Sequence, residues 1–185
     1  MPKLLVPLAD GFEDIEAFTI IDVLKRAGVN VVTCGLMGNT AVSRSGVKVS
    51  VDERMIDMEG ALKYDGIVIP GGSQGVENLL KSQNFLRIVD EFGKRGKFLG
   101  AICAGPRVLA KVGLLKERRA TIADGYEKEL GMPRSDPVVV DGNIVTSQAP
   151  GTAFKFALKI VELFSGRAKA EQLAVAKAVW SYAGD

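Results

Sequence analysis

Continuously apolar segments alternate along this chain with segments in which apolar residues recur at helical spacing. Continuous apolar runs are typical of parallel strands buried on both faces of a sheet. They occupy KLLVPLA at 3–9, VNVVTCGL at 29–36, YDGIVI at 64–69 and KFLGAI at 97–102. Between the first two runs, Ala17, Ile20 or Ile21, Leu24 and Ala27 recur as on one helix face, and Gly28 is a natural residue to end that helix.

The rest of the chain continues the alternation. Further helices are expected from about residue 75, at 84–95, 105–112, 151–164 and 168–182. Hairpins are expected at 41–52 and at the Asp-Gly turn of 137–147, with a short strand at 119–124. This order predicts a flavodoxin-like, doubly wound α/β fold, a mostly parallel sheet with helices on both faces. No linker or repeat interrupts it, so we expect a single domain over residues 1–185.

Composition and charge narrow the possible partners. The 185 residues are 47% hydrophobic and 25% charged, with a formal net charge of +2 and no basic block, so we expect no nucleic acid and no membrane surface as partner. No apolar run approaches the ~20 residues of a membrane span. The opening MPKLLVPLADGFEDIE is too short in its apolar part and too acidic for a secretory signal, which predicts a cytoplasmic protein.

The absence of histidine restricts the chemistry most. It excludes a Ser-His-Asp triad, a Cys-His dyad and any zinc site that contains histidine. The two cysteines, Cys34 and Cys103, are too few for a disulfide framework and lack the spacing of metal ligands. We therefore expect no metal and no cofactor, and chemistry carried by thiol, carboxylate, amine or backbone groups.

Cys103 is the candidate nucleophile. The segment AICAG at 101–105 places small residues two positions before and after it, between a strand and a helix, as in a nucleophile elbow. A helix N-terminus behind the thiol is expected to lower its pKa. The alternative is that Cys103 is only a small buried apolar residue, an interpretation that suits mid-strand Cys34 better.

Two other strand ends supply possible helpers. Gly71 and Gly72 would let backbone N–H groups approach a ligand or form an oxyanion hole, although a plain turn is an equal alternative. In DGFEDIE at 10–16, helix capping explains most of the acidic residues, but Glu16 lies past the first turn. A buried, protonated Glu16 would donate a hydrogen bond to a Cys103 thiolate.

The segments ADGFEDIEA, VIPGG, GAICAGP and TSQAPGTAFKFALKIVE, in this order, resemble the ThiJ/PfpI superfamily, in particular its parkinsonism-associated protein deglycase subgroup with YajL-like bacterial members. The resemblance implies a reactive, easily oxidised Cys103, a Glu16 carboxylic acid bonded to it, and Gly72 and Ala104 amides at an oxyanion site. It also implies a homodimer packed through the first helix. Arg26, Arg44, Gly71 and Pro150 would neighbour the substrate or the interface.

One departure from the family pattern bears on mechanism. Many relatives have a histidine about twenty residues after the cysteine, where this chain has Ala123, which argues against a Cys-His peptidase. The resemblance implies a cysteine-dependent enzyme acting on reactive dicarbonyls or their protein adducts, of glutathione-independent glyoxalase or deglycase type. The alternatives are a redox-responsive stress protein or chaperone, with Cys103 oxidised to sulfinate, and, less favoured, an intracellular peptidase.

Overall fold

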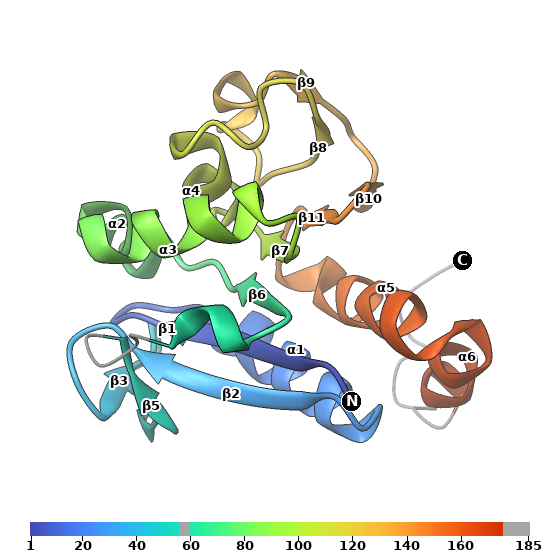
Figure 1. The fold of residues 1–185 in the computed structure, drawn as a ribbon, viewed down its shortest axis with the longest axis horizontal. Helices are drawn as coiled ribbons and strands as arrows, with labels where there is room; N and C mark the ends of the chain where they lie inside the picture. Colours follow the sequence, from blue (N-terminus) through green and yellow to red (C-terminus); the bar gives the residue numbers. More distant parts are fainter. Residues whose placement is uncertain (56–59, 176–185) are drawn as a thin grey trace.

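The computed structural model in Figure 1 describes residues 1–55 and 60–175. Its central sheet has the strand order β10-β11-β7-β6-β1-β2-β5 within these residues. All neighbouring strands are parallel except the β10–β11 pair, so the predicted flavodoxin-like, mostly parallel sheet is confirmed. The strands are β1 (Lys3–Leu8), β2 (Asn30–Gly35), β5 (Glu53–Arg54), β6 (Gly66–Ile69), β7 (Phe98–Ile102), β10 (Val138–Asp141) and β11 (Ile144–Ser147).

Helices cover both faces of the sheet because successive side chains of each buried strand point to opposite faces. Leu5 of β1 belongs to a hydrophobic cluster with the helices of one face, and its neighbours Leu4 and Val6 belong to the cluster of the other face. The first face carries α2 (Ser73–Lys81), α3 (Gln83–Lys94) and α4 (Pro106–Lys111). The second carries α1 (Asp14–Arg26), α5 (Ala153–Ser165) and α6 (Arg167–Val175).

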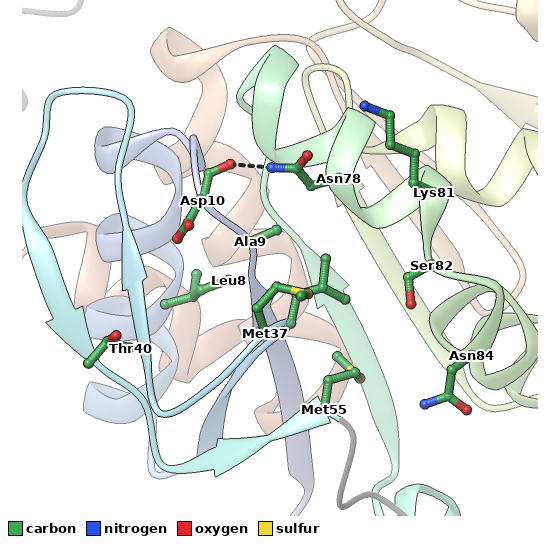
Figure 2. Close-up of a pocket in the computed structure, with 11 residues that line it drawn as sticks. Leu8, Ala9, Asp10, Met37, Thr40, Met55, Asn78, Lys81, Ser82 and Asn84 are labelled. Atoms are coloured by element: carbon green, nitrogen blue, oxygen red, sulfur yellow. Dashed lines mark hydrogen bonds between the residues drawn. The ribbon is translucent and has the colours of Figure 1, made fainter.

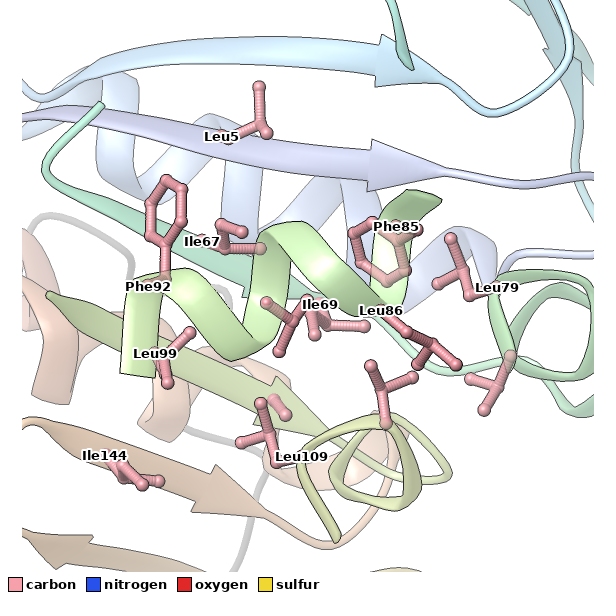
Figure 3. Packing of buried hydrophobic residues seen from close by; sticks show 14 of the residues in the cluster. Leu5, Ile67, Ile69, Leu79, Phe85, Leu86, Phe92, Leu99, Leu109 and Ile144 are labelled. Atoms are coloured by element: carbon pink, nitrogen blue, oxygen red, sulfur yellow. The ribbon is translucent and has the colours of Figure 1, made fainter. Parts of the chain in front are cut away.

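The core on the first face shows how the sheet is closed off from water. Phe85, Leu86 and Phe92 of α3 belong to one hydrophobic cluster with Ile67 and Leu99 of the sheet (Figure 3). Of these five side chains only Leu86 retains measurable exposure, 7%. Burying side chains of this size is worth about 1.5–3 kcal/mol each, so this face is a stable platform for the loops at its edge.

Both predicted hairpins are present. β3 (Thr40–Val42) pairs antiparallel with β4 (Lys48–Ser50), and β10 turns into β11 through Gly142 at a φ of 59°. The predicted strand at 119–124 is shorter, β8 (Arg119–Ala120), and pairs with β9 (Met132–Pro133). The predicted helix at 168–182 corresponds to α6 as far as Val175, and the rest of it lies outside the described residues.

The carboxyl ends of the parallel strands β1, β6, β7 and β11 lie at one edge of the sheet, where open α/β sheets collect their ligands. The loops at this edge also include the short 3-10 turns η3 (Glu127–Glu129) and η4 (Pro150–Thr152), while η2 (Ala61–Lys63) precedes β6. Among the described residues, we find no helix with the length and apolar character needed to cross a bilayer.

Candidate active site

Cys103 stands directly after β7 in a strained backbone conformation. Its φ is 60°, a left-handed value that no other non-glycine residue adopts in the described parts of the chain. Such strain persists only where the surroundings hold it. Here the Cys103 N–H donates to the Ser147 carbonyl at 2.9 Å, and the Cys103 carbonyl accepts from the Ala123 N–H at 2.9 Å. The predicted elbow is therefore held from both sides.

The small residue two positions after Cys103 is required by sterics. A Cβ on Gly105 would lie 2.8 Å from the carbonyl oxygens of both Ile69 and Ile102, the last residues of β6 and β7. Contacts this short are prohibitive for a carbon atom. The elbow thus turns into α4 through a position that only glycine fits.

Glu16 lies beside the thiol, as the resemblance implied. Its side chain is fully buried in α1, lies beside the Cys103 side chain, and accepts the Gly71 N–H at 2.6 Å through Oε2. A Cβ on Gly71 would lie 2.6 Å from Glu16 Oε2 and 2.6 Å from Cys103 Cβ, so glycine is needed for this approach. The Oε1 atom has no hydrogen-bond partner among the described residues, which disfavours an ionised carboxylate there.

Two backbone groups also face the sulphur. The Gly72 and Ala104 N–H groups act on the Cys103 thiol and favour its charged form. Gly72 has a φ of 92°, and a Cβ there would collide with the Gly11 carbonyl oxygen. Only glycine therefore fits at this position, from which the Gly72 N–H faces the sulphur. The arrangement therefore brings Cys103, Glu16, Gly71, Gly72 and Ala104 together as the sequence predicted.

The structure corrects the sequence-based prediction that the pKa of the Cys103 thiol is lowered. Burial, followed by the charge of an ionised Glu16, raises the pKa of Cys103 to about 12, and the Ala104 and Gly72 N–H groups offset this only in part. Burial also raises the pKa of Glu16 to about 7. The pair thus holds one proton from about pH 7 to about pH 12, because two adjacent buried negative charges repel each other.

Arg44 lies near this pair and Arg26 does not. Arg44 Nη1 pairs with Glu13 Oε2 at 2.8 Å, and its charge acts on both Glu16 and Cys103. Arg26 is ten residues after Glu16 in α1, about 15 Å along the helix axis, and its Nε pairs with Asp22 at 2.8 Å. The structure therefore does not bring Arg26 to the thiol.

The end of β11 and the loop after it contain a partner that the sequence did not reveal and the remaining predicted residue. Pro150 begins η4, three residues after Ser147, at the same sheet edge as Cys103. Ser147 holds the elbow through its carbonyl oxygen, a backbone role that residue type cannot signal. The same holds for Ala123, whose N–H donates to the Cys103 carbonyl.

Comparisons with known proteins agree with this geometry. The model of the DJ-1/PfpI family matches residues 2–163. Drosophila melanogaster protein dj-1beta is 36% identical over 174 residues, which cover 92% of this chain and 93% of that protein. The structure of Toxoplasma gondii DJ-1, described as oxidized, superposes with a TM-score of 0.91 at 34% identity and covers 98% of this chain and 100% of that one. The chain belongs to the DJ-1/PfpI family.

Three further relatives bear on length and activity. The Arabidopsis thaliana protein DJ-1 homolog B is 41% identical over 181 residues, 96% of this chain but only 41% of that longer protein. The chain likewise spans 46% of the Arabidopsis DJ-1 homolog A. The Caenorhabditis elegans protein named glutathione-independent glyoxalase DJR-1.2 is 35% identical and covers 92% of this chain and 91% of that protein.

Proposed function

We propose that this protein is a cysteine-dependent enzyme acting on small reactive dicarbonyls such as methylglyoxal or on their adducts with proteins. The observation that carries the proposal is the contact between Cys103, at its strained elbow, and the buried carboxyl of Glu16. The relative named as a glutathione-independent glyoxalase supports the same reaction class. No metal or organic cofactor takes part in the proposed chemistry.

The reactive form places the single negative charge of the pair on sulphur. A thiolate at Cys103 accepts from the Gly72 and Ala104 N–H groups and from protonated Glu16, whereas a Glu16 carboxylate accepts from Gly71 and leaves Oε1 without a partner. More donors converge on the sulphur than on the carboxylate. Hydrogen bonds to the charged form favour it, so these donors support the thiolate as the reactive minor form of a pair whose charge otherwise lies on Glu16.

The reaction then follows with balanced atoms. The thiolate attacks the aldehyde carbon, and the Glu16 proton passes to the carbonyl oxygen to give a hemithioacetal. Ionised Glu16 takes the proton from that carbon to give an enediolate and returns it to the neighbouring carbon. The hydroxyl proton on the former aldehyde oxygen passes to the neighbouring oxygen, and the product is a thioester of lactate. Water cleaves the thioester and restores the thiol, so methylglyoxal and water become lactate. The Gly72 and Ala104 amides stabilise the transient oxyanion.

Methylglyoxal consumption and lactate formation test this proposal. Cys103→Ala should abolish turnover, and Glu16→Gln should lower it by ~10² to 10⁴ because it keeps a donor but loses the transferable proton. Cys34→Ala is the matched control. Because Cys34 is fully buried in β2, this variant should leave turnover intact. Wild-type protein without turnover, or Cys103→Ala with normal turnover, would contradict the proposal.

A second candidate function is a redox response of the same thiol, supported by the similarity to a structure described as oxidized. Two equivalents of peroxide would convert a Cys103 thiolate to sulfinate and release two waters. Cys103 is half-buried, whereas Cys34 is fully buried in β2 and out of reach of peroxide. Mass spectrometry after treatment with mild peroxide should find sulfinate at Cys103 first. Equal modification of Cys34 would contradict a redox response that is specific to Cys103.

We also propose that the protein is a cytoplasmic homodimer. Ile15 and Phe18 of α1 are 54% and 41% exposed, and Val47 beside β4 is 49% exposed. The β3–β4 hairpin is bonded to the start of α1, since Ser45 Oγ donates to Asp14 Oδ1 at 2.6 Å. An apolar surface shared by these two elements supports pairing with a second copy.

A further inference from the structure

A half-open cavity of about 520 Å³ lies at the carboxyl ends of β1 and β2 (Figure 2). Cys103, Glu16 and Gly71 are not among its lining residues, so it is separate from the candidate active site. Its volume is within the range of small-molecule binding sites. The reaction proposed above does not use it.

One side of the cavity is apolar. Leu8 ends β1, Leu36 and Met37 follow β2, and Met55 follows β5. Met55 is buried at 1% exposure, whereas Met37 is 86% exposed. The cavity therefore has a buried apolar floor and a methionine at its mouth. Methionine is flexible and polarizable, so this wall adapts to a hydrocarbon or aromatic body.

The opposite side, where α2 meets α3, presents hydrogen-bond donors (Figure 2). Ser82 Oγ already accepts the Phe85 N–H at 3.2 Å, so its O–H remains to donate. Asn84 Oδ1 accepts from Arg87 at 3.1 Å, which leaves the amide NH₂ of Asn84. Lys81 Nζ makes no hydrogen bond or ion pair with any described residue. Its long side chain extends away from Ser82 and Asn84 (Figure 2) and also borders a neighbouring cavity, so it acts on this cavity through its charge.

The side-chain acceptors that line the cavity are either engaged or lie away from Ser82 and Asn84 (Figure 2). Asp10 Oδ1 accepts the Val42 N–H at 2.9 Å, and its carboxylate points away from Ser82 and Asn84 (Figure 2). The Asp10 carbonyl accepts from Asn78, whose own side-chain oxygen accepts from Gln74. The free groups are thus donors, one of them cationic. They match a ligand whose polar end only accepts hydrogen bonds and carries negative charge.

We propose that this cavity binds a small amphipathic carboxylate. The hydrocarbon body lies against Leu8, Leu36, Met37 and Met55, and the carboxylate receives hydrogen bonds from Ser82 and Asn84 and the charge of Lys81. Burial of the hydrocarbon and pairing of the carboxylate both contribute to the binding free energy. A ligand with only one of these two parts should therefore bind weakly. This site is independent of the dicarbonyl chemistry at Cys103.

Titration of the ¹⁵N-labelled protein with octanoate tests the proposal. We expect saturable amide shifts at 36–40 and 78–84. Octanol, which lacks the anion, and acetate, which lacks the body, should each bind at least tenfold more weakly. Met37→Asp places a negative charge at the mouth on an exposed side chain and should weaken octanoate at least tenfold.

Lys81→Met should weaken octanoate about fivefold. Lys111→Met is its matched control, because Lys111 borders the neighbouring cavity together with Lys81 but not this one. Cys103→Ala should bind octanoate like the wild type. No saturable shifts at these residues, octanol as strong as octanoate, equal loss in the two lysine variants, or loss in Cys103→Ala would each overturn the proposal.

Discussion

At the scale of single residues, the site is defined by one shared charge in a crowded space. Glu16 and Cys103 approach each other only because Gly71 has no side chain. Their burial makes a second negative charge so unfavourable that the pair keeps one proton well above neutral pH. Near pH 7, Glu16 is therefore close to half protonated, which lets it both give and take a proton.

The pH dependence of stability should report this carboxyl. The folded pKa of Glu16 is about 7, above its ordinary value of 4.5. The folded state therefore binds a proton at Glu16 more tightly than the unfolded state does. This contribution to the free energy of unfolding is fully present below pH 4.5 and is lost as the pH rises to about 7. The loss is on the order of 3 kcal/mol by proton linkage.

Urea unfolding from pH 4 to 8 measures this fall. Glu16→Gln should remove it, because the unfolded state of that variant has no carboxyl at position 16 to ionise. Glu117→Gln, at an exposed glutamate outside the site, is the control and should keep the wild-type profile. A wild-type profile that is flat between pH 4.5 and 7 would show that Glu16 ionises normally.

At the scale of elements, the strong periodic signals predicted most of the fold, and contacts between distant segments explain the rest. The continuous apolar runs became β1, β2, β6 and β7 because each is covered on both faces. The two-residue strands β5, β8 and β9 are too short to carry a pattern, and they pair only where the tertiary fold aligns them.

The acidic loop at 10–16 also makes contacts with a distant segment that the local sequence could not predict. Helix capping explained Asp10, Glu13 and Asp14 from sequence, but the structure corrects this. Asp10 accepts from the Val42 N–H, Glu13 pairs with Arg44, and Asp14 accepts from Ser45, all on the hairpin about thirty residues further along the chain. These carboxylates fasten the β3–β4 hairpin beside the thiol. No local pattern reveals such a partner.

Arg107 joins the elements behind the elbow. Its Nη1 pairs with Glu77 of α2 at 2.6 Å, its Nε pairs with Glu129 of η3 at 2.8 Å, and its guanidinium lies 4.6 Å from the Tyr126 ring centroid. The side chain of Arg107 is only 17% exposed. Lysine has neither the fork nor the planar surface for these contacts.

Arg107→Lys should therefore lower the free energy of unfolding by about 1–2 kcal/mol, because two pairs and one stacking contact weaken together. Arg95→Lys is the control, since Arg95 forms one exposed pair with Glu91 within α3 and should cost less than about 0.5 kcal/mol. Denaturant titration compares the two variants. Equal effects would show that the Arg107 contacts contribute no more than a surface pair.

At the scale of the whole molecule, the candidate active site borders the surface proposed for dimerisation. Glu16 faces the thiol from α1, and Ile15 and Phe18 of the same helix are exposed. Arg44 extends from the hairpin with its side chain 67% exposed. A second copy packed on α1 and the hairpin would exclude water from this region. The geometry of the candidate active site would then depend on dimer formation.

The oligomeric state tests this arrangement. Sedimentation at micromolar concentration should give about twice the 19.7 kDa monomer mass. Phe18→Asp should yield monomers, because a charge in an apolar interface loses its solvation without a partner. Met132→Asp is the control, since Met132 is also 40% exposed but lies in β9, far in sequence from α1 and the hairpin, and should remain dimeric. If the wild type sediments as a monomer, or if both variants dissociate alike, α1 and the hairpin do not form the interface, and their exposed apolar side chains need another explanation.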